Sequence, residues 1–305
     1  MGSAKEIEHP GVITSIDSFK FRIKTSLNKK KNVMINSKCT FQNFKFPAFP
    51  FLFFIITLFF IPVSCRYNQK EKNTLINDNI DNEKNITLNK LSKEETEKGW
   101  ELLWNGKTTA GWRSIKGKSF PDSGWVIHNG ILIVEESGSG GSIITVKKYS
   151  DFELKIEVKL TDRANSGIKY FVMEELSSPG FGIGLEYQIL DDEKHPDANK
   201  GIHPGSRTFA SLYDLIAPTN KTTSPVGQWN TVQIISYGTQ IEHWLNGKKV
   251  LEYERGSKQF RKLVQTSKYK NIPGFGEAPD GYILLQDHGN QVSFRNIKIR
   301  VNKPE

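Results

Sequence analysis

The stretch Phe152-Glu-Leu-Lys-Ile-Glu-Val-Lys-Leu160 decides the fold class of this chain. Its apolar residues occupy every second position, and charged residues fill the positions between them. Successive side chains of a β-strand point to opposite faces, so this pattern predicts an antiparallel strand with one buried face and one wet face.

Similar signals continue on both sides of this stretch. Hairpins are expected at Asn129-Gly130 and Asn246-Gly247, because Asn-Gly supplies the positive φ angles of a type I′ turn. Ser92-Lys-Glu-Glu95 fits a capping box and predicts one short helix. No other segment has convincing helical periodicity. Further strands are expected over residues 142–147, 165–173, 183–190, 207–213, 230–237, 281–287 and 292–301.

About a dozen short strands joined by turns indicate an all-β protein, a two-sheet sandwich of jelly-roll type. The longer connections would supply the walls of a binding cleft. These connections are residues 174–182, 191–206, 214–228 and 254–280.

The positive charge of the chain belongs mainly to its first 45 residues. They carry nine Lys or Arg against three acidic residues, so they hold six of the nine net positive charges. A charge confined to a leader does not describe a binding face, and nucleic acid is not expected as a partner.

Residues 46–65 form an uncharged apolar segment that ends in Val63-Ser64-Cys65. Its three prolines disfavour a helix across the bilayer, and the segment is typical of an export signal. Val-Ser-Cys resembles the lipobox of bacterial lipoproteins, which implies lipidation of Cys65. The alternative is a signal anchor with an incidental cysteine.

Four parts of the chain are therefore expected. Met34 reads as the natural start, which leaves residues 1–33 as a non-native or misassigned leader. The signal peptide occupies residues 34–65, a flexible tether 66–91 and the β-sandwich domain 92–305. The chain would be exported and held at a membrane only through its lipid anchor, in the periplasm or on the outer cell surface. Cys39 and Cys65 both precede the domain, which excludes a disulfide, a cysteine nucleophile and cysteine-ligated zinc there.

The strand expected near residues 184–190 carries the most concentrated polar chemistry. Alternation places Glu186 and Gln188 on the face opposite to the apolar residues of this strand. The same alternation sends Asp191 away from Glu186, so a bulge or the strand end would have to turn it back. On spacing alone, a solvated strand face that ends in an acidic turn is the commoner outcome.

An ordered set of motifs runs from residue 100 to residue 301. It includes Leu103-Trp-Asn-Gly-Lys107, Asn165-Ser-Gly-Ile168, Gln228-Trp-Asn230 and Leu285-Gln-Asp-His-Gly289. The set resembles the bacterial 3-keto-disaccharide hydrolase domain, formerly a domain of unknown function. The resemblance implies a concanavalin A-like jelly roll related to family 16 glycoside hydrolases. It also implies an oxidised carbohydrate as substrate, a 3-keto-disaccharide or a 3-keto-glucoside.

Family 16 enzymes carry their catalytic carboxylates as Glu-x-Asp-x-x-Glu, and the same spacing here reads Glu186-x-Gln188-x-x-Asp191. The central glutamine argues against an ordinary retaining mechanism. A ketone at C3 instead acidifies the proton on C2, so the glycosidic bond can leave by elimination and water can add afterwards. That route needs a base near C2, an acid near the leaving oxygen and donors to the C3 carbonyl.

Three residues are therefore predicted to be catalytic. Glu186 is the expected base or metal ligand, and Asp191 its partner. His288 follows an apolar strand and suits acid–base work or metal ligation. The expected substrate-binding residues are Gln188, Gln286, Lys169, Arg295, Tyr213 and Asn165. Lys169 and Arg295 could polarise a carbonyl or form salt bridges, and Tyr213 could stack on a sugar or belong to the core.

No cofactor motif is recognised. A divalent metal in the loop of Asp192, His195 and His203 is conceivable, although their spacing fits no known metal motif. Two other functions remain open. One is a non-catalytic carbohydrate-binding module of the same fold, with an open groove lined by aromatic residues. The other is an ordinary family 16 glycosidase that acts on unoxidised glucans.

Overall fold

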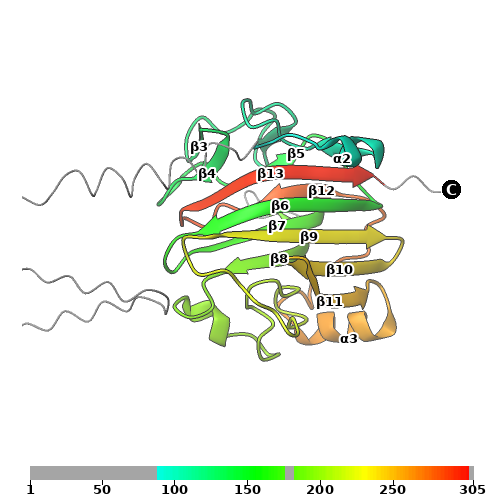
Figure 1. Ribbon diagram of the computed structural model, residues 1–305. Helices are drawn as coiled ribbons and strands as arrows, with labels where there is room; N and C mark the ends of the chain where they lie inside the picture. The colour runs from blue at the N-terminus through cyan, green and yellow to red at the C-terminus, as the bar shows by residue number, and fades with distance from the viewer. Residues whose placement is uncertain (1–87, 176–181, 302–305) are drawn as a thin grey trace, which may run out of the picture. The chain divides into compact units, whose positions relative to one another are not determined.

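The computed structural model describes residues 88–175 and 182–301 (Figure 1). The chain divides into two compact units, Met1–Arg66 and Tyr67–Glu305, and all described residues belong to the second. The expected leader, the signal peptide with Cys65 and most of the tether therefore lie outside the described residues. Within the described ranges, no helix has both the length and the apolar character needed to cross a membrane.

Two antiparallel sheets lie face to face, which confirms the predicted jelly-roll sandwich (Figure 1). The larger sheet has the order β11 (Lys248–Glu254), β10 (Gln240–Leu245), β9 (Trp229–Tyr237), β6 (Phe152–Leu160), β13 (Val292–Val301), β4 (Ile131–Val134) and β3 (Trp125–His128), with β1 (Trp100–Leu102) paired to β13. The smaller sheet has the order β2 (Trp112–Ser114), β5 (Ile143–Thr145), β12 (Tyr282–Leu285), β7 (Asn165–Met173) and β8 (Ile183–Leu190).

The apolar core lies between the two sheets. Every second residue of β6 is buried, from Phe152 to Leu160. Leu185, Tyr187 and Ile189 of β8 are fully buried in the same apolar cluster. Removing these inner faces from water is the main term that stabilises the sandwich. The intervening residues of β8 therefore project from the outer face of the smaller sheet, away from the larger one.

The local turn and cap signals form the structures that they predicted. Asn129 and Gly130 join β3 to β4 with φ angles of 49° and 74°, and the Asn-Gly pair between β10 and β11 has similar positive angles. Before helix α2 (Lys93–Glu97), the Ser92 hydroxyl accepts from the Glu95 N–H, and the Glu95 carboxylate accepts from the Ser92 N–H. These contacts are local in sequence, which explains why the sequence predicts them.

Residues 207–213 do not form the predicted strand. Their backbone still runs along the edge of β8, because the Ala210 N–H donates to the Gln188 carbonyl at 2.9 Å and the Tyr213 N–H donates to the Glu186 carbonyl at 3.0 Å. A φ of 69° at Ala210 turns the chain out of the extended conformation and interrupts the ladder. The segment thus covers the edge of the smaller sheet as a loop.

A helix, α3 (Lys258–Thr266), occupies part of the segment that was predicted to be a loop. The Ser257 side chain caps it by accepting from the Phe260 N–H at 3.1 Å. Phe260, Leu263 and Val264 stand at i, i+3 and i+4, and Phe260 and Val264 are buried, so the sequence of this short helix does carry a helical period. Packing and the cap decide this helix, and it brings the residues that follow it to the cavity described below.

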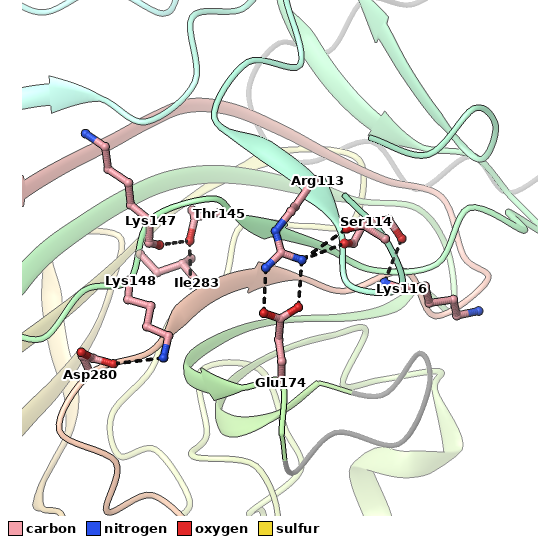
Figure 2. A network of polar contacts seen from close by, with 10 residues as sticks. Arg113, Ser114, Lys116, Thr145, Lys147, Lys148, Glu174, Asp280 and Ile283 are labelled. Atoms are coloured by element: carbon pink, nitrogen blue, oxygen red, sulfur yellow. Dashed lines mark hydrogen bonds and ion pairs between the residues drawn. The ribbon is translucent and has the colours of Figure 1, made fainter. Parts of the chain in front are cut away.

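On the outer face of the smaller sheet, Arg113 of β2 reaches over β12 to Glu174, the residue after β7 (Figure 2). Its guanidinium makes two hydrogen bonds of 2.8 Å to the Glu174 carboxylate and lies 5.1 Å from the centre of the Tyr282 ring. This bidentate pair ties strands that are not neighbours in the sheet.

Candidate active site

A cavity of about 190 Å³ opens on the outer face of the smaller sheet. Strands β7 and β8 and the chain after β12 supply most of its polar groups, and Ser142, Gly182, Tyr213 and Lys268 come from other loops. Its lining residues are Ser142, Asn165, Lys169, Gly182, Glu186, Gln188, Tyr213, Lys268, Gln286, Asp287 and His288. Seven of the nine predicted catalytic and substrate-binding residues are among them. A larger cavity of about 520 Å³ beside α3 contains none of the nine, so the convergent polar groups single out the smaller cavity.

Glu186 is the buried carboxylate of this cavity, with 5% of its surface exposed. Lys169 lies directly opposite on β7, and its Nζ is 3.6 Å from Oε2 of Glu186. The same ammonium donates to the Gly182 carbonyl at 3.0 Å. A charged group is tolerated in a buried position only when it is paired, and Lys169 provides that pairing.

The amide of Gln188 holds the other oxygen of Glu186. With its nitrogen toward the carboxylate, it donates to Oε1 of Glu186 at 3.2 Å and to the Ser166 carbonyl at 3.0 Å. The reverse orientation would set the amide oxygen against two acceptors, so the hydrogen-bond network assigns the first. The far end of the amide lies 3.2 Å from the Asn165 side chain. Gln188 can orient Glu186, but an amide cannot serve as a second carboxylate.

Gln286 adds an unpaired acceptor to the cavity. Its N–H donates to the Gly167 carbonyl at 2.9 Å, which places it beside β7 just beyond the end of β12. Its side-chain oxygen is buried and has no hydrogen-bond partner among residues 88–175 and 182–301. A buried acceptor without a donor is unfavourable, so a ligand hydroxyl in the cavity would satisfy this oxygen.

Lys268 is a cavity residue that the sequence analysis missed. Its ammonium lies 4.1 Å from the centre of the Tyr213 ring and 5.0 Å from that of Tyr269. The side chain opens to solvent through the cavity, yet the protein atoms around the ammonium desolvate it, and this burial lowers the pKa of Lys268. Nothing in the local sequence distinguishes it from the neighbouring lysines; only the fold places it here.

Tyr213 presents its ring, not its hydroxyl, to the lysine. The phenol donates to Oδ2 of Asp197 at 2.7 Å. Burial, reinforced by this hydrogen bond, raises the pKa of Tyr213 well above its usual range. The phenol therefore stays protonated and engaged with Asp197, so Tyr213 serves as a contact surface and not as a proton donor.

Asp287 and His288 complete the cavity. The two oxygens of Asp287 accept from the backbone N–H groups of Gly141 at 3.0 Å and Gly289 at 2.9 Å. These bonds fix the loop that carries His288, which is exposed at the cavity. Asp287 belongs to the quoted motif, but the sequence did not reveal that backbone amides occupy its carboxylate.

Asp191 lies outside this cavity, contrary to the predicted pairing with Glu186. Its carboxylate accepts from the backbone N–H groups of Arg163 at 2.8 Å, Glu193 at 3.2 Å and Lys194 at 3.3 Å. The ladder between β7 and β8 runs without a bulge at this end, so alternation is kept and Asp191 is not turned back toward Glu186. Its carboxylate holds the turn after β8.

Arg295 also lies elsewhere, on β13 of the larger sheet. Its Nε donates to Oε2 of Glu157 at 2.7 Å, and its guanidinium lies 4.0 Å from the centre of the Trp229 ring. The salt bridge that the sequence left open as an alternative is therefore the one that forms. Arg295 does not line the cavity.

The three residues considered for a metal serve other contacts. Asp192 pairs with Lys221 at 2.7 Å, His195 caps the 3₁₀ helix η1 (Pro196–Asn199), and His203 contacts the Thr266 hydroxyl at 3.2 Å. Across the described part of the chain, no group of three or more His, Cys, Asp or Glu could hold a metal ion.

Comparisons with known proteins agree with the fold. The family model of the 3-keto-alpha-glucoside-1,2-lyase-like domain matches residues 99–300. The chain is 36% identical over 230 residues to a 3-keto-disaccharide hydrolase of Bacteroides thetaiotaomicron, a match that covers 67% of this chain and 78% of the relative. A crystal structure from Parabacteroides distasonis, provisionally described as a glycosyl hydrolase, is 30% identical with a TM-score of 0.64. That match covers 71% of this chain and 100% of the other.

The matched region coincides with the sandwich and contains every lining residue of the cavity. It supports a glycoside hydrolase function for the chain. The protein therefore belongs to the family of 3-keto-alpha-glucoside-1,2-lyase-like domains.

Proposed function

We propose that this protein cleaves glycosides whose sugar ring carries a ketone at C3, by elimination across C1–C2 followed by addition of water. The observation that carries the proposal is one buried carboxylate, Glu186, between a cationic side and an amide side of the same cavity. Lys169 and Lys268 form the cationic side, and Gln188 and Gln286 belong to the amide side. The names of the relatives support both halves of the reaction, since one describes a 1,2-lyase and the other a hydrolase.

In the elimination step, Glu186 takes the proton from C2. The electron pair of the C2–H bond forms the C1=C2 double bond, and the C1–O bond breaks. The ketone lowers the barrier because negative charge passes through its oxygen as an enolate. The ammonium groups of Lys169 and Lys268 are placed to stabilise that charge, and fixed charges act most strongly in a cavity that excludes water.

The leaving oxygen requires a proton. His288 is exposed at the cavity, outside the pair formed by Glu186 and Lys169, and we assign it to this proton transfer. In the second step, water adds its oxygen to C1 and gives one proton to His288, while Glu186 returns its proton to C2. The products are the free 3-keto sugar and the alcohol that left, and each protein group recovers its starting protonation state.

An ordinary retaining mechanism has little support in this cavity. Its only two carboxylates among the described residues are Glu186 and Asp287, and backbone amides occupy both oxygens of Asp287. Gln188 stands where a family 16 enzyme has its central aspartate. A free second carboxylate to form or assist a covalent glycosyl intermediate is therefore not found in the described lining.

The binding-module alternative also has weak support. It predicts an open groove lined by aromatic residues, whereas Tyr213 is the one aromatic side chain among the described lining residues. A buried carboxylate held in place by two partners is better suited to proton transfer than to gripping sugar hydroxyls.

The test compares the purified protein and Glu186→Gln on 3-keto-trehalose, a 3-keto-glucoside and the unoxidised parent sugars. Release of 3-keto-glucose should fall by about 10²- to 10⁴-fold in the variant, the usual contribution of a general base. Glu157→Gln is the matched control, because Glu157 is a salt-bridged strand carboxylate on the larger sheet. Turnover of parent sugars but not of keto sugars by the wild type would contradict the proposal.

We further propose that the protein is exported and anchored through a lipid on Cys65. The support is the sequence alone, namely the apolar segment that ends in Val-Ser-Cys. Expression of Cys65→Ser in a bacterial host should move the protein from the membrane fraction to the soluble fraction. An unchanged distribution would argue for a signal anchor.

A further inference from the structure

Arg207 joins two loops beside the cavity. Its Nη1 donates to Oδ1 of Asp197 at 2.9 Å, and its Nε donates to Oδ1 of Asp214 at 2.7 Å. Asp197 belongs to η1, and Asp214 directly follows Tyr213. The side chains of the arginine and the two aspartates are 18%, 12% and 2% exposed, so the two ion pairs are largely shielded from water.

Each aspartate uses its second oxygen to hold a cavity residue. Oδ2 of Asp197 accepts from the Tyr213 phenol at 2.7 Å. Oδ2 of Asp214 accepts from the backbone N–H of Lys268 at 2.9 Å. Arg207 is thus connected, through one carboxylate each, to two cavity residues that come from loops, Tyr213 and Lys268.

The two loop residues also contact each other. The Lys268 ammonium and the Arg207 guanidinium lie 4.1 Å and 5.1 Å from the centre of the Tyr213 ring. Cations are attracted to an aromatic face at such distances. Within the described ranges no acceptor forms a hydrogen bond to the Lys268 ammonium. Its place in the cavity therefore depends on the rings of Tyr213 and Tyr269 and on its own backbone, and Arg207 is connected to the Tyr213 ring and to that backbone.

We propose that Arg207 is a positioning residue, which fixes Lys268 at the cavity through Asp214 on one side and through Asp197 and Tyr213 on the other. The inference rests on the proposed function, in which Lys268 stabilises the enolate oxygen. Arg207 does not line the cavity, so it acts only through these residues.

The same contacts determine whether the pKa of Lys268 rises or falls when Arg207 is replaced. Burial lowers the pKa of Lys268, the carboxylates of Glu186 and Asp214 raise it, and the positive charges of Lys169 and Arg207 lower it. Replacing Arg207 with a neutral residue removes one of these cations and leaves Asp214 without its partner. A Lys268 ammonium released toward water would also regain hydration. All three changes raise the Lys268 pKa.

The experiment measures the Lys268 pKa by competitive acetylation across a pH series, read by mass spectrometry of the full chain. Wild type is compared with Arg207→Gln, with the conservative Arg207→Lys and with the control Arg113→Gln. Arg113 also makes a bidentate pair, with Glu174, but it is not among the charges that shift the Lys268 pKa (Figure 2). Steady-state kinetics on a 3-keto-glucoside accompany the labelling.

Arg207→Gln should raise the Lys268 pKa and lower kcat by about 10²-fold, the usual cost of misplacing a group near the reacting atoms. Arg207→Lys should shift the pKa in the same direction by less, and Arg113→Gln should leave it unchanged. An unaltered Lys268 pKa in folded Arg207→Gln would overturn the inference. If that variant does not fold, an unaltered value in Arg207→Lys has the same meaning.

The labelling needs no substrate, which separates the two proposals. A Lys268 pKa that shifts as expected in a protein without activity on keto sugars would reject the proposed function alone. A wild-type enzyme that is active on keto sugars, with a Lys268 pKa insensitive to Arg207, would reject the positioning role alone.

Discussion

Gly167 of β7 leaves the space that the Glu186 carboxylate occupies. A Cβ atom built on Gly167 would lie 2.5 Å from Oε1 of Glu186, and the next two nearest atoms also belong to the Glu186 side chain. The φ of Gly167 is one that other residues adopt, so the glycine is needed here for space and not for backbone conformation. In the sheet, Gly167 is flanked by Gln188 on β8 and by Gln286 beyond β12.

Gly167→Ala is therefore expected to move the Glu186 carboxylate and little else. We predict a loss of kcat by about 10²-fold, because a shift of about 1 Å in a catalytic group has that effect. The thermal midpoint should change little, since the displaced atoms end a side chain. Gly117→Ala is the control, because a Cβ atom there meets nothing within 4 Å. Full activity in Gly167→Ala would contradict the assignment of Glu186 as the catalytic base.

Gln286→Leu tests whether the unpaired oxygen of Gln286 meets the substrate. Removing a buried acceptor that lacks a donor should leave the free energy of unfolding unchanged or slightly raised. Loss of one hydrogen bond to a sugar hydroxyl should lower kcat/KM by roughly 3- to 10-fold. Equilibrium denaturation and initial rates, measured on the same preparations, separate the two effects. A less stable variant with unchanged kcat/KM would show that the oxygen has a structural partner instead.

Asp191→Asn tests the carboxylate that lies outside the cavity. Its oxygens accept three backbone N–H groups, and an amide replaces one of those acceptors with a donor. We expect a loss of roughly 1–3 kcal/mol in the free energy of unfolding, the cost of leaving buried donors unsatisfied. The kcat of the folded enzyme should stay near the wild-type value. A lower kcat with unchanged stability would show that Asp191 has a catalytic role.

Protonation of His243 is expected to make the stability of the protein depend on pH. This residue is fully buried between the sheets, where Nε2 lies 2.8 Å from the Tyr170 hydroxyl and Nδ1 lies 3.0 Å from the Ala210 carbonyl. These partners assign the neutral tautomer with the proton on Nδ1. Burial lowers the pKa of His243 to about 4, against an ordinary value of 6.5.

The unfolded chain therefore binds a proton at His243 more readily than the folded chain between pH 6.5 and 4. Its contribution to stability is complete above pH 6.5 and falls as the pH drops to about 4, by up to roughly 3 kcal/mol. Urea denaturation at several pH values should show this decline. His243→Gln cannot titrate, so its stability should be lower at pH 7 but should fall less steeply with acid. Equal slopes in the two proteins would assign the acid sensitivity to other groups.

The order of apolar and polar residues along the chain is enough to predict the sandwich and the faces of its strands. In β6 and β8 the alternation of apolar and polar residues is local, because a strand turns successive side chains to opposite sides whatever it packs against. The Asn-Gly hairpins and the Ser92 cap are equally local. The outward direction of Glu186 and Gln188 could be predicted for the same reason.

The groups that meet at the cavity are brought together by contacts between segments that are far apart in the sequence. Lys268 reaches it because α3 forms and because Asp214, 54 residues earlier, binds its backbone. The Asp191 carboxylate accepts a hydrogen bond from the backbone N–H of Arg163, 28 residues away, and lies outside the cavity. Neither contact leaves a pattern in the local sequence. Such contacts depend on the free energy of the whole fold, in which distant backbone amides and side chains compete for the same carboxylate oxygens.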